Sequence, residues 1–111
     1  MDFKTLLADT SAGLAAYRKV QPEGAKGFSA MHQAAMVDGA ISLKDKELMC
    51  IAIGIVSHCN DCIGFHVKAG LRLGMTREEL AEVVSVCMYM GGGPAYMYGA
   101  HAMAAFDELS A

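Results

Sequence analysis

The sequence predicts an all-α fold, a single-domain bundle of about six helices that assembles into a homo-oligomer. No stretch alternates apolar and polar residues with the period of a strand, and proline occurs only at positions 22 and 94. The 111 residues suffice for one domain, which we expect to span residues 1–111. Hydrophobic residues make up 54% of the chain and charged residues only 19%. We expect hydrophobic subunit interfaces to bury this apolar excess.

Three helices are expected in the first half of the chain. Apolar residues recur at helical spacing over residues 2–19, and Pro22 then interrupts the pattern. A second helix is expected at about 24–37. Ser42 followed by Asp45 resembles a capping box, which predicts the start of a third helix. The later part of that helix is apolar on all sides, which is typical of a central core helix.

Three more helices are expected in the second half. The fourth should cover about 61–73 and end before Gly74. The sequence TREE is a complete capping box, and it predicts a fifth helix from about 76 to 90. The tight turn GGGP should separate it from a sixth helix over 94–109, because proline suits the first turn of a helix.

Charge and composition exclude several function classes. The net charge is −3 and no stretch is rich in lysine or arginine, which argues against nucleic acid or an anionic membrane as a partner. The uncharged segment 83–106 contains the GGGP turn, so one membrane-spanning helix is not expected there. The N-terminus lacks the features of a signal peptide. We therefore expect a cytoplasmic protein, in which structural disulfides are uncommon.

The stretch HCNDCIGFH concentrates the chemistry-bearing residues. Cys59 and Cys62 form a CxxC pair at the predicted start of a helix, where unpaired backbone N–H groups and the helix dipole favour a thiolate. That spacing is typical of a dithiol/disulfide couple. His66 lies four residues after Cys62, on the same helix face, where an imidazole can exchange a proton with the thiol.

Three further residues could act on this cluster, Glu47 as a catalytic partner of His66, and His58 and Asp61 by tuning the thiols. Glu47, on the third predicted helix, would orient His66 or act as a base if its carboxylate pointed inward. His58 adjoins Cys59 and could tune that thiol. Asp61 adjoins Cys62, and its negative charge would raise the pKa of the Cys62 thiol.

Two other interpretations of the cluster remain open. The two cysteines could be buried structural thiols. Alternatively, Cys59, Cys62 and His66 could bind zinc, with His58 or Glu47 as a fourth ligand, although three ligands on one helix turn crowd a tetrahedral site. Cys50 and Cys87, the remaining cysteines, lie among apolar neighbours and are expected in the core.

The spacing Glu47-x11-Cys59-x2-Cys62-x3-His66 resembles the signature of the alkyl hydroperoxidase D-like (AhpD-like) branch of the carboxymuconolactone decarboxylase family. The similarity extends through CIGFHVKAGLRLGMTREELAEVVSVCMYMGGGPAYMYG and covers about residues 25–105. The resemblance implies an AhpD-like helical subunit that forms trimers or hexamers. It also implies an alkylhydroperoxidase-type, thiol-dependent peroxidase that needs no flavin, haem or metal. The decarboxylase branch lacks this CxxC, so its activity on a muconolactone is not expected here.

The resemblance also implies a role for each residue. Cys62 would be the peroxidatic nucleophile and Cys59 the resolving cysteine, while Glu47 and His66 would form a proton relay. A small hydroperoxide or disulfide would be the substrate, and a dithiol or a thiol protein the reductant. Two alternatives stay open: thiol–disulfide exchange without peroxidase activity, and a non-catalytic oligomeric module that senses redox state.

Overall fold

The computed structural model describes all of residues 1–111, which form helices connected by turns and contain no strand. The five helices are α1 (Phe3–Val20), α2 (Pro22–Ala35), α3 (Leu43–Val56), α4 (Asn60–Arg72) and α5 (Arg77–Leu109). The prediction of an all-α fold is therefore confirmed.

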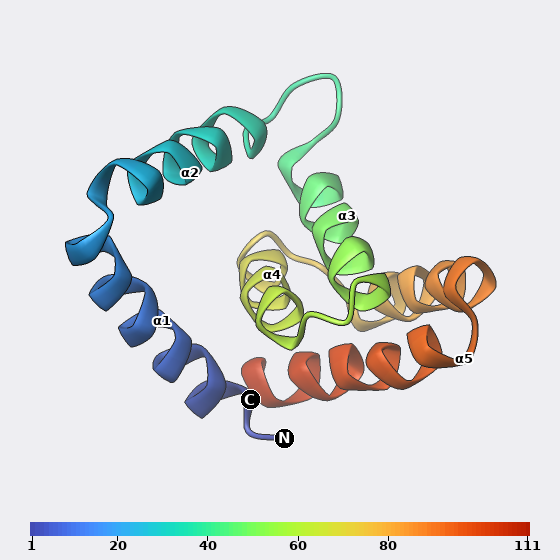
Figure 1. The fold of residues 1–111 in the computed structure, drawn as a ribbon. Helices are drawn as coiled ribbons and strands as arrows, with labels where there is room; N and C mark the ends of the chain where they lie inside the picture. The colour runs from blue at the N-terminus through green and yellow to red at the C-terminus, as the bar shows by residue number, and fades with distance from the viewer.

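Helices α3, α4 and α5 pack against one another, whereas α1 and α2 form an arm that extends from them (Figure 1). The arm is attached through α1, which packs against α4 and α5, while the packing of α2 is with α1 and one lysine of α3 reaches its last turn. Side chains of α3, α4 and α5, together with Phe3 at the start of α1, form one continuous hydrophobic core. Its largest fully buried side chains are Phe3, Ile51, Ile55, Ile63, Leu80 and Val67.

Short polar or sulfur-bearing side chains begin four of the five helices. Asp2 caps α1, Ser42 caps α3, and Cys59 caps α4. Thr76 and Glu79 form the expected reciprocal capping box at the start of α5. These contacts satisfy backbone N–H groups that have no partner inside the helix, and they fix where each helix starts.

Helix α5 corrects the expected helix count from six to five. Residues Arg77–Leu109 form one element, but the expected break at GGGP is present inside it as a sharp kink, where Gly92 alone has non-helical dihedrals, with φ 72° and ψ −155°. Figure 1 shows the chain reversing at this bend. A side chain at Gly99 would collide with Val84, since its Cβ would lie 2.5 Å from a Val84 methyl carbon. The two halves of α5 therefore pack closely against each other.

Helix α2 also differs from expectation, because it starts at Pro22 and ends at Ala35 instead of spanning about 24–37. Proline is well placed in the first turn, since its missing N–H would have no helical partner there. At the other end, the Lys46 ammonium donates to the carbonyl oxygens of Ala35 and Val37, at 3.0 and 2.7 Å. This side chain from α3 caps the last turn of α2.

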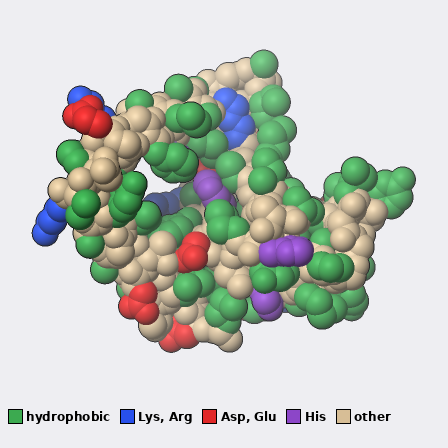
Figure 2. All heavy atoms as spheres, in the orientation of Figure 1, with side chains coloured by type: hydrophobic (Ala, Val, Ile, Leu, Met, Phe, Trp, Pro, Cys, Tyr) green, Lys and Arg blue, Asp and Glu red, His purple; other side chains and the backbone are tan.

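Much apolar surface stays exposed, because only 18 of the 111 residues are buried and none of these lies in α2. Hydrophobic side chains cover much of the α1–α2 arm and the bend of α5, and the surface is hollowed between the arm and the other helices (Figure 2). None of the five helices combines the length and the apolar character needed to cross a membrane.

Candidate functional site

Cys59 and Cys62 form a disulfide across the first turn of α4, with their Cα atoms 5.3 Å apart. The Cys59 sulfur is also the cap of this helix and accepts a hydrogen bond from the Cys62 backbone N–H at 3.2 Å. The Cys59 N–H donates to the Gly54 carbonyl at 2.9 Å, so the end of α3 positions the start of α4. His58 makes the turn between them with a left-handed φ of 59°. A helix start stabilises negative charge, so a reduced cysteine here is favoured as a thiolate.

Gly54 allows α3 and α4 to approach each other at the cysteine pair. A Cβ added at Gly54 would lie 3.2 Å from the Cys62 Cβ, closer than ordinary van der Waals contact, and 3.4 Å from the Ile63 backbone nitrogen. The absence of a side chain on α3 therefore determines how deeply Cys62 sits against that helix.

Glu47 and His66 connect the two helices one turn further along. The His66 Nδ1 and the Glu47 Oε1 are 2.6 Å apart, and the Glu47 side chain is only 7% exposed while that of His66 is 26% exposed. Glu47 is also the one buried charged residue of the chain. An ionised carboxylate only accepts hydrogen bonds, so it favours the imidazole tautomer or ion that carries a proton on Nδ1.

Cys50 belongs to the same cluster, although we expected it in the apolar core. It is half-buried, and its Sγ lies within 4.8 Å of a carboxylate oxygen of Glu47 and a ring nitrogen of His66. Burial raises the pKa of the Cys50 thiol, and the negative charge of Glu47 raises it further. Cys87 is buried in the core as expected, and burial raises the pKa of its thiol as well.

Two cavities meet at His66. The smaller has a volume of about 160 Å³ and brings Cys62, Cys50 and His66 together beside Gly54. The larger, of about 440 Å³, lies between the arm and α3–α4, and both Glu47 and His66 border it. Its apolar wall comes from three helices, through Leu14, Phe28 and Phe65. The His66 ring thus lies between a small sulfur-lined cavity and a larger, mainly apolar hollow.

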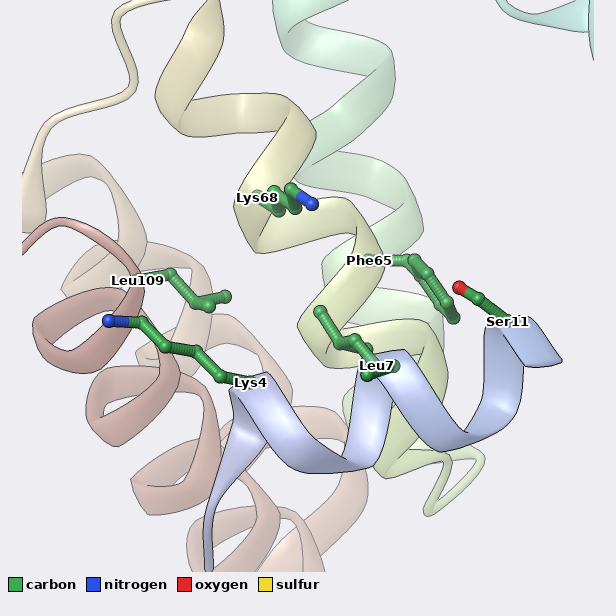
Figure 3. A pocket seen from close by; sticks show the side chains of 7 residues that line it. Lys4, Leu7, Ser11, Phe65, Lys68 and Leu109 are labelled. Atoms are coloured by element: carbon green, nitrogen blue, oxygen red, sulfur yellow. The ribbon is translucent and has the colours of Figure 1, made fainter.

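A separate cavity of about 260 Å³ lies between α1, α4 and the end of α5 (Figure 3). Two lysines, Lys4 and Lys68, border it together with Leu7 and Leu109. It contains none of the cysteines or histidines, so it offers no thiol or imidazole chemistry.

The two residues next to the cysteines, His58 and Asp61, have partners of their own. The Thr10 hydroxyl of α1 donates to the Asp61 carboxylate, which ties the arm to the start of α4. The His58 ring stacks on Tyr98 with ring centroids 4.7 Å apart, and Tyr98 also makes an edge contact with His101. The side chain of His58 is thus held against α5, beside the cysteine turn.

Spacing along the sequence found four of the clustered residues, namely Glu47, Cys59, Cys62 and His66, but it missed Cys50. Cys50 follows Glu47 by three residues, which places both on one face of a helix, and this i,i+3 relationship was the available signal. It also missed His101, whose Nδ1 lies 2.9 Å from the Asn60 Oδ1. That contact joins residues 41 positions apart, so only the tertiary structure reveals it.

A family model described as the carboxymuconolactone decarboxylase family matches residues 22–107. Two curated relatives are uncharacterised proteins. The one from Cupriavidus necator is 39% identical over 110 residues, covering 99% of this chain and 97% of its own length. The other, protein 4 of the cox locus of Paracoccus denitrificans, is 35% identical over 82 residues, or 74% of each chain.

Two solved structures share the fold. The apo form of lpg0406, a carboxymuconolactone decarboxylase family protein from Legionella pneumophila, is 45% identical with a TM-score of 0.96, covering 98% of this chain and 97% of its own. A protein of the same family from Thermotoga maritima has a TM-score of 0.83 and covers 94% of this chain and 89% of its own. At 24% identity, that second likeness concerns the fold alone.

Proposed function

Because the chain belongs to the carboxymuconolactone decarboxylase family, a part of the AhpD-like superfamily, we propose that it is a thiol-dependent peroxidase. It would reduce hydroperoxides through a dithiol/disulfide cycle of Cys59 and Cys62. One observation carries the proposal: Cys62 and His66 border one cavity, and the buried Glu47 holds the His66 ring at 2.6 Å. A nucleophile, a base and a residue that orients the base are thus brought together.

In the first step, the Cys62 thiolate attacks the terminal oxygen of a hydroperoxide. An S–O bond forms and the O–O bond breaks, which leaves a sulfenic acid on Cys62 and an alkoxide that takes a proton from His66. Glu47 stabilises the protonated His66 ring and keeps its Nδ1 engaged. The leaving group therefore departs as an alcohol, or as water when the substrate is hydrogen peroxide.

In the second step, the Cys59 thiol attacks the sulfur of the sulfenic acid. The disulfide forms and water leaves, and an external dithiol then restores both thiols by exchange. The net reaction moves two electrons from that dithiol to the peroxide. A reducing compartment such as the cytoplasm would supply the dithiol.

The larger hollow supports an organic hydroperoxide as the substrate. Its volume is about 440 Å³, and Leu14, Phe28 and Phe65 give it an apolar wall next to His66. An alkyl group placed there would leave water, with the peroxide group at the His66 ring, which also borders the smaller cavity that Cys62 lines.

The cycle is tested by mixing reduced protein with one equivalent of cumene hydroperoxide and counting free thiols over time. Wild type should lose two thiols per chain. Cys59→Ser should lose one thiol and trap a sulfenic acid. Cys62→Ser should lose no thiol over the time in which wild type reacts. Cys87→Ala is the matched control, because Cys87 lies in the core away from the pair. An unchanged thiol count in wild type after peroxide treatment contradicts the proposal.

A second candidate function is thiol–disulfide exchange with a partner protein, without peroxide. Both cysteines of the pair are only partly buried, so an external thiol can reach them. This function predicts fast oxidation of the reduced protein by a small disulfide and slow oxidation by peroxide. The ratio of the two rate constants decides between the candidates.

We also propose that the protein works as a homo-oligomer, a trimer or a hexamer. The chain exposes 6783 Å², whereas a compact monomer of 11.7 kDa exposes about 5,900 Å². Helix α2 buries no residue, and Tyr89 at the bend of α5 is 87% exposed. Light scattering of wild type should give a mass several times that of one chain, and Tyr89→Asp or Met31→Asp should lower it. A monomeric wild type contradicts this assembly.

A further inference from the structure

Cys50 has no role in the cycle above, yet it lies among the cycle's proton-transfer residues. One ligand atom each from Glu47, Cys50 and His66 lies within 4.8 Å of the other two, and the three residues come from α3 and α4. Glu47 is buried and the other two are half-buried, so all three are shielded from solvent on at least one side. Such a set of a carboxylate, a thiol and an imidazole is a set of metal ligands.

The three donors suit zinc better than other divalent ions. Sulfur and nitrogen ligands select against Mg²⁺ and Ca²⁺, which prefer oxygen ligands, whereas Zn²⁺ accepts sulfur, nitrogen and carboxylate oxygen together. A tetrahedral zinc site separates its ligand atoms by about 3.4–3.8 Å. The present separations reach 4.8 Å at most, so small side-chain movements would complete the site.

The contact of Glu47 with His66 is compatible with zinc binding by the same two side chains. At 2.6 Å the two groups are within hydrogen-bond distance, and a zinc ion placed between them would replace this contact and widen their separation. The hydrogen-bond contact of the Cys50 sulfur is a weak one, with the Met36 sulfur at 3.8 Å. A rotation of Cys50 toward the ion would therefore break no strong interaction.

The fourth ligand comes from the redox pair itself. Cys62 borders the same small cavity as Cys50 and His66. In the disulfide its sulfur is bonded to Cys59 and has no negative charge to offer, whereas reduction frees a thiolate. We propose that the reduced protein binds one Zn²⁺ per chain through Glu47, Cys50, His66 and Cys62, and that formation of the disulfide releases the ion.

Zinc bound in this way would block peroxide reduction, because it occupies the nucleophile and its base together. This consequence rests on the proposed peroxidase function, but the metal site itself does not. Zinc binding is measured at equilibrium without turnover, so an inactive protein that binds zinc and an active protein that does not are distinguishable results.

The test is a titration of zinc into the reduced full chain in competition with a chromophoric chelator, with a phosphine as the reductant. Wild type should bind one equivalent. Cys50→Ala should bind at least tenfold more weakly, and so should the wild-type disulfide form. Cys59→Ser should bind as wild type does, because Cys59 is not a ligand. Cys87→Ala is the matched control for loss of a thiol outside the cluster, and circular dichroism checks the folding of each variant.

The Cys50 and Cys59 variants separate this site from a zinc site on the CxxC pair. If Cys59→Ser loses binding and Cys50→Ala keeps it, the ion uses the CxxC pair and the proposal is wrong. The proposal is also wrong if the reduced wild type takes no zinc from a chelator whose dissociation constant is in the micromolar range. Cobalt gives an independent signal, since two thiolate ligands predict sulfur-to-metal charge-transfer bands in the reduced protein that halve in intensity in Cys50→Ser.

Discussion

The Glu47 carboxylate and the His66 imidazole lie 2.6 Å apart, and this contact joins the buried face of α3 to the helix that carries both cysteines. A carboxylate at Nδ1 fixes the ring orientation and leaves Nε2 as the nitrogen that gains and loses a proton. Burying a charge is unfavourable unless it has a partner, so the His66 ring stabilises the buried Glu47 carboxylate while the carboxylate orients the ring. This pairing supports the assignment of His66 as the proton donor in the proposed cycle.

Replacing Glu47 with glutamine should slow the oxidation of Cys62. An amide can accept a hydrogen bond but has no negative charge, so it stabilises the protonated His66 ring less, and the second-order rate constant with peroxide should fall by about 10- to 100-fold. The pH at which the rate is half-maximal should also shift, and stopped-flow measurements across pH 5–9 report both effects. Glu82→Gln, at an exposed position of α5, is the control. Equal pH profiles for Glu47→Gln and wild type would exclude Glu47 from the reaction.

Replacing Asp61 with asparagine should lower the pKa of the reduced Cys62 thiol. The carboxylate next to Cys62 opposes the thiolate, and its removal leaves the favourable helix start unopposed. In a Cys59→Ser background, the absorbance of the thiolate near 240 nm gives this pKa directly. Thr10→Val is the control, because it removes the hydroxyl that binds Asp61 and keeps the charge. A Cys62 pKa that rises in Asp61→Asn contradicts this assignment of Asp61.

The sequence indicated the helices and the CxxC–histidine geometry because both depend on local spacing. Cys62 and His66 share one helix, so their relation follows from 3.6 residues per turn. Capping residues marked the start of α5 for the same reason. The all-α class was predictable because every segment carries helical periodicity or a helix cap.

Contacts between helices could not be predicted from local spacing. The spacing of Cys50 did not reveal that the thiol points at His66, because this depends on how closely α3 and α4 pack at Gly54. The contact of Asp61 with Thr10 joins residues 51 positions apart. The GGGP segment predicted a break in the helix, but it did not show that Gly92 alone would depart from helical dihedrals, with both halves of α5 reaching up to it.

The ion pair of Arg77 with Asp107 joins the start of α5 to its end and makes stability depend on pH. Hydrogen bonding to the Arg77 guanidinium lowers the pKa of the Asp107 carboxyl below its ordinary value of 3.8. A lowered folded-state pKa stabilises the protein at pH values above 3.8, and that contribution is lost as the pH falls through the folded-state pKa. The melting temperature, measured from pH 7 to pH 2.5, should therefore fall less steeply below pH 4 in Asp107→Asn than in wild type. Parallel curves would show that this exposed pair contributes nothing.

The four thiols of the reduced protein should differ in reactivity. Burial raises the pKa values of the Cys50 and Cys87 thiols, so both stay protonated at neutral pH. Cys59 and Cys62 lie at a helix start, which favours the thiolate. Iodoacetamide at pH 7 should therefore alkylate the CxxC pair first, and peptide mass spectrometry at short times measures the order. Alkylation of Cys50 before Cys62 would contradict it.

Gly54→Ala should reduce both stability and the rate of Cys62 oxidation, although alanine usually stabilises a helix relative to glycine. The new Cβ would lie 3.2 Å from the Cys62 Cβ and 3.5 Å from the Ile63 side chain, which is fully buried and cannot move aside easily. We expect α4 to shift and the free energy of unfolding to fall by about 1–2 kcal/mol. Gly13→Ala in α1 is the matched control. Its Cβ would meet nothing within 4 Å, so it should gain up to about 1 kcal/mol. Denaturant melts measure both variants, and a Gly54→Ala protein as stable as Gly13→Ala would show that the α3–α4 contact has room for a side chain.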